Sequence, residues 1–425
     1  MKPTQVRIRA YQVGFGDCFL LTVFYDDESA RHVLVDFGST GFPPGVKGNR
    51  LAAIARDIRD TTGGKLTAVV ATHRHKDHIS GFATNKSKTG AGDIIAALKP
   101  ELVIQPWTED PALAPKATGP KVAKGGANLQ ALHVQSLDAM QTVAERILAE
   151  TKASRSLVRE TRAELTAVAE VNVKNQSAVD NLRDMVPKSG REYLFFGEPT
   201  QLQDLLPGSK IEVLGPPTVD QHAAVAKEKD WDPDEYWLRF SEQTTPTGED
   251  GALFPGHVVG RKQYRFPIDS RWLIYRAKRL RGEQMQAIVT NLDNALNNTS
   301  VILYLRIGKK AFLFPGDAQG ENWEYALSKP NIRTMLKKVD VYKVGHHGSR
   351  NATPKTLWGL MTGSDNSKKA EFTTVMSTME GKYGDTEETA VPRGTLVTAL
   401  KKKSTLHTTQ DIHAEDLYFD LTIDV

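Results

Sequence analysis

Four potential metal-binding side chains fall within six residues of the segment ATHRHKDHISG, at His73, His75, Asp77 and His78. An apolar stretch that predicts a buried strand comes directly before them. In an extended chain, residues 73 and 75 lie on the same side with Cα atoms about 7 Å apart, so their imidazoles can share one ion. Asp77 and His78 fall on the turn beyond and can reach a second ion, as two-metal hydrolytic sites require. A solvated polar turn is the alternative, which the gathering of three of the 11 histidines here disfavours.

Two later segments also place possible ligands after an apolar strand. In AFLFPGDAQG, Asp317 follows such a strand in a turn, where its two oxygens can bridge two cations. In VDVYKVGHHGS, the strand leads to His346 and His347. Each segment alone is more typical of a turn carboxylate or a packed imidazole. Together with residues 73–78, they predict one metal centre.

Composition limits what this centre can be. Cys18 is the single cysteine of 425 residues, which excludes an intramolecular disulfide and zinc sites built from several thiolates. The 55 Lys and Arg residues against 51 Asp and Glu give a net charge of +4, which permits a nucleic-acid partner without indicating one. We find no apolar run of about 18 or more residues and no N-terminal signal region. We therefore expect a cytoplasmic protein with no membrane partner.

The surrounding pattern predicts an α/β fold that positions these residues. The first forty residues alternate apolar and polar side chains and predict three strands joined by turns. Apolar residues at helical spacing follow at 51–58, and then come the strand segments LTAVVATH and LVIQPW. Strand patterns return in REYLFFG and KIEVLGPP and continue over the last 130 residues.

Five motifs, in this order, resemble those of the metallo-β-lactamase fold hydrolases. They are the turn GFGDC at 14–18, LVDFGS around Asp36, THRHKDH, FLFPGD and KVGHHGS. The chain most resembles the soluble domain of the bacterial competence DNA-uptake channel proteins and their free-standing relatives. The resemblance covers about residues 5–105 and 290–380, plus IEVLGPP near 211. It implies a four-layer αββα sandwich with two insertions. The motifs are specific for this fold, but they say little about the substrate.

The resemblance also implies roles for individual residues. His73 and His75 would bind a first zinc ion, Asp77 and His78 a second, and Asp317 would bridge the two. Asp36 would orient the metal loop as a hydrogen-bond acceptor. One of His346 and His347 would complete the second site. Because adjacent residues of a strand face opposite ways, we expect the other imidazole to contact substrate or backbone, and we favour His346 as the ligand.

One departure from the family concerns the first metal, for which most members supply a further histidine. No histidine stands in a matching place, because His133 and His257 are both expected at the surface. The competence-like branch is Asn-rich here, and Asn297 stands 20 residues before Asp317 in ALNNTSVILYL. We expect Asn297 or its neighbour Asn298 to take the place of the missing imidazole. An Asn carbonyl is a harder and weaker ligand than imidazole. We therefore expect one or two Zn²⁺ ions, with a weak first site that accepts Mn²⁺ or Mg²⁺ or is empty.

The expected organisation has five segments. Residues 1–107 form the N-terminal half of the fold, 172–217 add strands, and 291–425 form the C-terminal half. Residues 108–171 are an insertion with a Lys/Gly/Pro-rich loop and helices, and residues 218–290 are a second insertion. We expect the part at 110–170 to regulate access to the site, through a regulatory protein partner or a protease that cuts its loop. A solvated decoration is the alternative.

The function expected from the resemblance is metal-dependent hydrolysis of phosphodiesters in nucleic acid. Asp77 would orient the nucleophile, while His347 and either Lys343 or Arg350 would contact the phosphate. One alternative is a phosphoesterase acting on small or choline-bearing esters. Another is a catalytically reduced binding or regulatory module, because the first metal lacks a histidine.

Overall fold

The computed structural model describes residues 1–111, 145, 147–149, 151, 165–166, 175–222, 292–349, 353–363, 372–382 and 390–425. The chain divides into two compact units. The first comprises Met1–Gln135, Lys174–Ala226 and Asn294–Val425, and the second comprises Ser136–Val173 and Lys227–Asp293. Every strand and helix named below belongs to the first unit. The two predicted insertions lie mostly outside the described residues, as do His133, His257 and Arg350.

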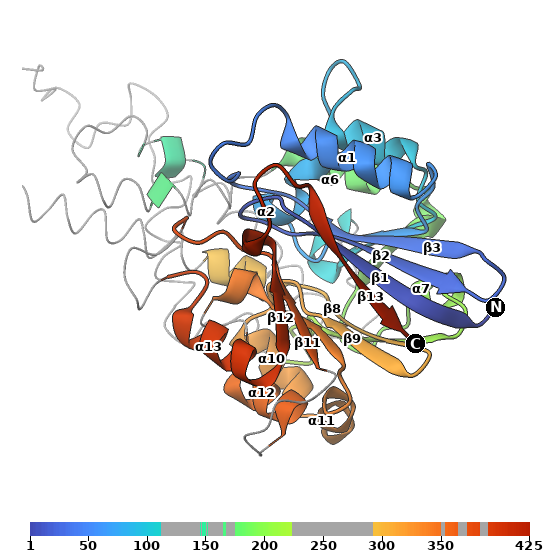
Figure 1. The fold of residues 1–425 in the computed structure, drawn as a ribbon, viewed down its shortest axis with the longest axis vertical. Helices are drawn as coiled ribbons and strands as arrows, with labels where there is room; N and C mark the ends of the chain where they lie inside the picture. The colour runs from blue at the N-terminus through green and yellow to red at the C-terminus, as the bar shows by residue number, and fades with distance from the viewer. Residues whose placement is uncertain are drawn as a thin grey trace, which may run out of the picture. The chain divides into compact units, whose positions relative to one another are not determined.

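The first sheet has seven strands in the order β13-β1-β2-β3-β4-β5-β6. The pairs β13–β1, β1–β2 and β2–β3 are antiparallel, and the pairs β3–β4, β4–β5 and β5–β6 are parallel. The C-terminal strand therefore pairs with the N-terminal one (Figure 1). The strands are β1 (Pro3–Tyr11), β2 (Cys18–Tyr25), β3 (Ala30–Phe37), β4 (Ala68–Val70), β5 (Leu102–Pro106), β6 (Arg191–Leu194) and β13 (Tyr418–Asp424). The three strands predicted from the first forty residues are confirmed.

The second sheet has six strands in the order β12-β11-β10-β9-β8-β7. Strands β7, β8 and β9 run antiparallel, and β9 to β12 run parallel. The strands are β7 (Ser209–Gly215), β8 (Ile302–Ile307), β9 (Lys310–Phe314), β10 (Val341–Lys343), β11 (Thr373–Met376) and β12 (Thr405–Thr408).

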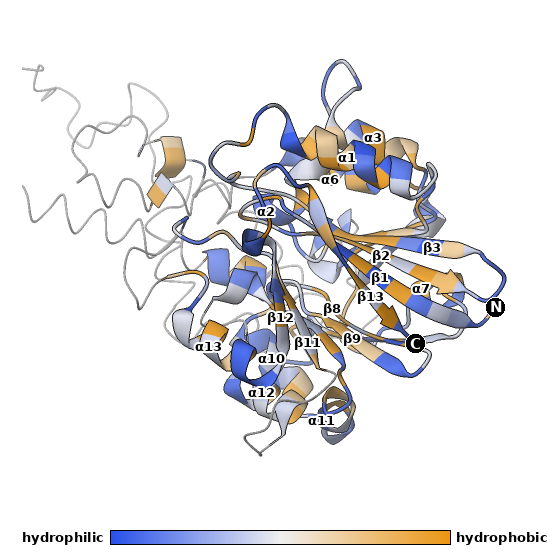
Figure 2. Ribbon diagram, in the orientation of Figure 1, coloured by the Kyte–Doolittle hydropathy of each residue, from blue (hydrophilic) through white to orange (hydrophobic). Residues whose placement is uncertain are grey.

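Alternating side chains divide the core into layers. Along β2, Phe19, Leu21 and Val23 face the core between the two sheets, whereas Cys18 and Leu20 face the helices on the outer side. The rings of Phe19 and Phe314, one from each sheet, are 6.2 Å apart. Figure 2 shows hydrophobic residues concentrated along the strands. Burial on both faces of each sheet thus produces the expected α/β sandwich of two mixed sheets with helices outside.

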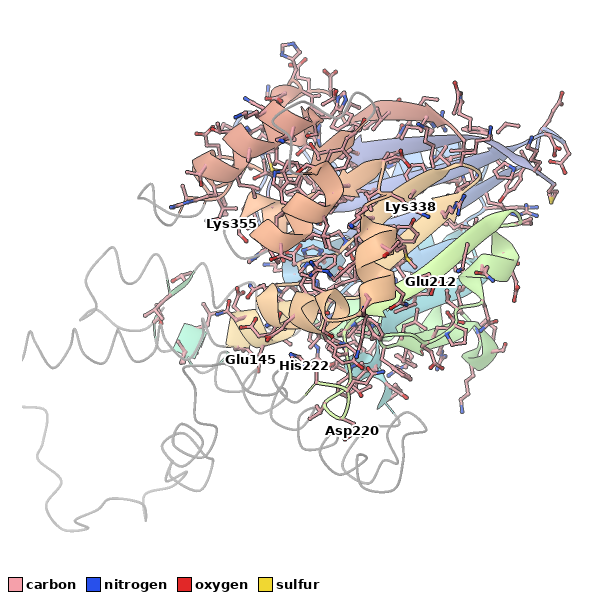
Figure 3. The ribbon with its side chains drawn as sticks, turned by 90° about the horizontal axis from the view of Figure 1, so that it is seen from below. Glu145, Glu212, Asp220, His222, Lys338 and Lys355 are labelled. Atoms are coloured by element: carbon pink, nitrogen blue, oxygen red, sulfur yellow. The ribbon has the colours of Figure 1, made fainter. Side chains whose placement is uncertain are left out.

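Helices cover the outer face of each sheet. On the first sheet lie α1 (Arg50–Thr61), α3 (Ala91–Ala97) and α6 (Gln176–Asp184). On the second lie α10 (Gly320–Leu327), α11 (Pro330–Leu336), α12 (Lys355–Thr362) and α13 (Gly394–Lys403). Figure 3 views this second group of helices from below and labels Lys355, the first residue of α12. The short helices α2 (Lys76–Ile79) and α7 (Leu202–Leu205) also belong to the first unit, and residues 294–297 are helical as well. Among the described residues, no helix combines the length and apolar character that a bilayer crossing requires.

Candidate metal centre

The predicted ligands meet where strands from both sheets end. His73, His75, Asp77 and His78 follow β4, and Asp317 follows β9. Turn η8 (His346–Gly348) follows β10. The carboxyl ends of parallel strands share one edge of a sheet, so loops that are distant in sequence converge there.

Four buried side chains form a cluster that could bind a metal ion. Asp77, His78, Asp317 and His347 each offer one ligand atom, and these atoms all lie within 4.8 Å of one another. Nε2 of His78 is 2.9 Å from Oδ2 of Asp317, and Nε2 of His347 is 3.0 Å from Oδ2 of Asp77. Nε2 of His347 also lies 3.6 Å from Oδ2 of Asp317. Two imidazole nitrogens and two carboxylates thus converge from three separate segments.

The other nitrogens of these histidines are held by the surrounding chain. Nδ1 of His78 lies 2.8 Å from Oδ2 of Asp36, which also accepts a hydrogen bond from the Thr72 hydroxyl. The Thr72 backbone N–H donates to the other carboxylate oxygen of Asp36 at 2.7 Å. Nδ1 of His347 lies 3.0 Å from the carbonyl oxygen of Ser377. Such contacts fix the ring orientation of a metal-binding histidine and direct its Nε2 toward the cluster.

A second group of potential ligands lies beside this cluster. Nε2 of His73 is 2.9 Å from Nδ1 of His75, and the rings of His73 and His78 are 4.2 Å apart. Asn297 is fully buried, with its Nδ2 3.5 Å from Nε2 of His346. The neighbouring Asn298 instead donates to Glu321 and accepts from the backbone of Gln319. Asn297 is therefore the asparagine that lies at the site.

The two adjacent histidines, of which we favoured His346 as the ligand, differ in their surroundings. Both have left-handed backbone conformations, with φ of 42° for His346 and 52° for His347, so strand alternation does not govern them. His347 joins Asp77 and Asp317, whereas Nδ1 of the half-buried His346 lies 2.8 Å from the Ser349 hydroxyl. His347 is therefore the member of the pair that joins the candidate metal cluster, and His346 lies beside it.

Lys343 occupies a buried position beneath the cluster. Its side chain is only 3 % exposed, and its Nζ pairs with Asp17. The same Nζ lies 3.2 Å from the carbonyl oxygen of Gly316 and 3.5 Å from Oδ1 of Asp317. This placement favours support of Asp317 over direct contact with phosphate. Our sequence analysis missed Asp17, although it lies in the GFGDC turn; the signal was its position directly before a buried strand.

Burial and neighbouring charges shift the pKa values of the aspartates and histidines at the site in opposite directions. Burial raises the pKa of Asp36. Burial also opposes ionisation of Asp77, but the adjacent His78 and His347 outweigh it and lower the pKa of Asp77 to about 2. For His78, burial opposes protonation, and the carboxylates of Asp317 and Asp36 outweigh it, so its pKa lies well above the usual value. Without a metal ion, protons on the histidines therefore offset the negative charge of the neighbouring carboxylates.

The residues present fit a metal ion on two further counts. Four carboxylates are buried here among the described residues, those of Asp17, Asp36, Asp77 and Asp317, and without a metal ion they depend on Lys343 and on protonated histidines for compensation. Buried charge without compensation is costly. In addition, Oδ1 of Asp77 is buried and has no hydrogen-bond partner among the described residues. A donor set of imidazole nitrogens and carboxylate oxygens suits Zn²⁺ and, with more oxygen ligands, Mn²⁺.

In comparisons with known proteins, no protein-family model matches the chain, and no curated protein matches its sequence. The structure itself establishes an α/β fold with two mixed sheets and a buried His/Asp cluster. That combination is compatible with a metallo-hydrolase fold.

The loop at residues 73–78, which carries four of the candidate ligands, packs against Gly38, where a side chain would not fit. A Cβ added at Gly38 would lie 2.4 Å from the backbone carbon of Asp77 and 2.5 Å from the backbone nitrogen of His78. We expect Gly38→Ala to lower the free energy of unfolding by about 1–3 kcal/mol and to reduce metal content, because the loop must move. Urea unfolding and elemental analysis measure both effects. Gly320→Ala is the control, since a Cβ there meets nothing within 4 Å; equal behaviour of the two variants would contradict the expectation.

Proposed function

We propose that this chain is a metal-dependent hydrolase of the metallo-β-lactamase fold that cleaves phosphodiesters, with nucleic acid as the first substrate to test. The observation that carries the proposal is the buried cluster of Asp77, His78, Asp317 and His347. The order of the motifs along the chain and the two-sheet sandwich support the fold assignment.

Two sets of residues would hold the metal ions. Asp77, His78, Asp317 and His347 would bind one ion, and His73, His75 and Asn297 would contribute to a weaker site. When bound, such ions polarise a phosphoryl oxygen and lower the pKa of water. Asp317 lies where its carboxylate can serve both sites, because its backbone and side chain contact residues from two loops. Its Oδ1 accepts from the His346 backbone N–H at 3.0 Å, and its Oδ2 faces His78.

The chain's own groups would orient the reacting molecules. Oδ2 of Asp77 faces His347, which leaves Oδ1 to accept a hydrogen bond from the attacking water and align it. His346 is the partly exposed histidine at this edge, with Nδ1 directed to Ser349. The Ser349 hydroxyl would donate to Nδ1, so that Nε2–H would donate to a phosphate oxygen as negative charge develops there. Lys343 would hold Asp317 in place from below.

Replacing Lys343 tests this positioning role. We expect Lys343→Met to lower the free energy of unfolding by about 3 kcal/mol in chelator, because it leaves Asp17 and Asp317 buried without their cation. Added Zn²⁺ should restore more stability to this variant than to the wild type, since the ion compensates the same carboxylates. Urea unfolding with and without Zn²⁺ measures both effects. Lys338→Met, at an exposed position, is the control. Full stability of Lys343→Met, with loss of activity alone, would favour direct contact with phosphate instead.

The proposed activity has a direct test. Purified protein is supplied with Zn²⁺ or Mn²⁺ and incubated with supercoiled, linear and single-stranded DNA, with RNA, and with bis(p-nitrophenyl) phosphate. We expect metal-dependent cleavage of at least one substrate. Metal binding without any cleavage would favour the catalytically reduced binding module.

A small phosphodiester is the second candidate substrate, and one observation favours it. A cavity beside the site is lined by Glu380 and Asp411, and the described residues that line it include no lysine or arginine. Such a surface repels a polyanionic strand.

A further inference from the structure

A cavity of about 450 Å³ lies next to the metal cluster and has no role in the mechanism above. Its volume is in the range of small-molecule sites. Four loops contribute its walls, after β1, before α1, after β11 and after β12. The lining residues are Gln12, Gly14, Pro43, Pro44, Thr378 and Met379, followed by Glu380, Thr409, Gln410, Asp411, Ile412 and Ala414.

Two residues that line the cavity are sequence neighbours of residues that contact His347. Thr378 lines the cavity and directly follows Ser377, whose carbonyl oxygen faces Nδ1 of His347. Gly14 lines it on another side and directly precedes Phe15, whose ring centroid is 4.4 Å from that of His347. A molecule in the cavity would therefore contact Thr378 and Gly14. These residues are the sequence neighbours of Ser377 and Phe15, which contact the proposed metal ligand His347.

Hydrogen bonds hold these walls in place. The Thr378 backbone N–H donates to the Thr409 hydroxyl at 3.1 Å, and that hydroxyl contacts the Thr378 carbonyl oxygen at 3.3 Å. On the opposite side, Nε2 of Gln12 donates to the carbonyl oxygen of Ile412 at 3.2 Å. Arg50 in turn donates to both the backbone and side-chain oxygens of Gln12. A site whose walls are already tied together costs little ordering when a ligand binds.

The lining has a clear chemical preference. Among the described lining residues, the charged ones are Glu380 and Asp411, and both are negative. Pro43, Met379 and Ile412 provide apolar surface. Thr378 is only 1 % exposed, and its hydroxyl has no hydrogen-bond partner among the described residues. These features suit a positively charged group on a short aliphatic chain, with polar contacts at one end and apolar contacts along its length.

We propose that this cavity is a subsite for an organic cation, an alkylammonium group carried by the phosphodiester substrate. The claim that an organic cation binds here depends on the cavity alone. The claim that this cation is part of the substrate rests on the proposed function. The phosphodiester would lie at the metal centre, and the ammonium group would lie between Glu380 and Asp411.

The binding test uses three probes of matched size: n-butylammonium, n-butanol and butyrate. The full chain carries ¹³C-methyl methionine, so that Met379 reports from the cavity wall. We expect saturable shifts of the Met379 methyl signal with n-butylammonium, weaker ones with n-butanol and none with butyrate. Glu380→Gln and Asp411→Asn should each weaken n-butylammonium binding by about three- to five-fold, as loss of one exposed ion pair predicts. Glu101→Gln, an exposed acid outside the cavity, should leave it unchanged.

Equal affinity for all three probes, or n-butylammonium binding that neither substitution weakens, would overturn the cation subsite. A second experiment compares hydrolysis of p-nitrophenyl 4-aminobutyl phosphate and p-nitrophenyl butyl phosphate. We expect a lower KM for the amino compound, with the difference reduced in Asp411→Asn. Equal KM values would overturn the substrate part. Hydrolysis of neither compound, with n-butylammonium binding intact, would count against the proposed function and leave the cation subsite supported.

Discussion

Asp317→Ala is expected to remove bound metal and to lower phosphodiester hydrolysis by about 10³-fold or more. Asp317 contacts both sides of the proposed centre: its Oδ2 is 2.9 Å from Nε2 of His78, and its Oδ1 accepts from the His346 backbone. It also faces Lys343. No other carboxylate among the described residues holds all three contacts. Metal content by elemental analysis and initial rates at saturating Zn²⁺ or Mn²⁺ measure the two effects.

The control for Asp317→Ala is Asp60→Asn, which removes a carboxylate that is 67 % exposed on α1. This variant should keep its metal and its rate. The account would be wrong if Asp317→Ala retained the wild-type metal content while remaining folded by circular dichroism.

His346→Ala and His347→Ala are expected to have different effects. Nε2 of His347 points at Asp77 and Asp317, so His347→Ala should weaken metal binding by about 10²-fold or more and abolish most activity. His346 lies against Ser349 and Asn297, so His346→Ala should keep the metal of the main cluster. Its rate should fall by about 10²-fold through loss of a group that contacts phosphate.

Titration with Zn²⁺ against a competing chelator gives the metal affinity of each variant, and kcat at saturating metal gives the rate. His347→Gln is a useful second variant if His347→Ala folds poorly, because it keeps most of the buried volume. Equal metal loss from the two alanine variants would contradict the separate roles.

Much of the framework could be predicted from the sequence, because alternating and helical patterns are local. Strands β1 to β3 follow directly from the alternation in the first forty residues. The gathering of His73, His75, Asp77 and His78 follows from their density after a buried strand. These features do not depend on distant parts of the chain.

Other features depend on backbone geometry that a sequence pattern does not contain. We favoured His346 over His347 because we expected a strand, whereas both residues have positive φ in the turn η8. Lys343 was expected to meet phosphate, but its position at the end of β10 directs it inward to Asp17. The choice between Asn297 and Asn298 also required the structure, since only their hydrogen-bond partners separate them.

The most direct test of the central claim is metal content per chain, measured together with hydrolysis before and after chelation. We predict one to two Zn²⁺ or Mn²⁺ ions per wild-type chain, loss of phosphodiester hydrolysis on removal of the metal, and recovery on its return. A protein that is free of metal and still hydrolyses phosphodiesters at the full rate would contradict the account.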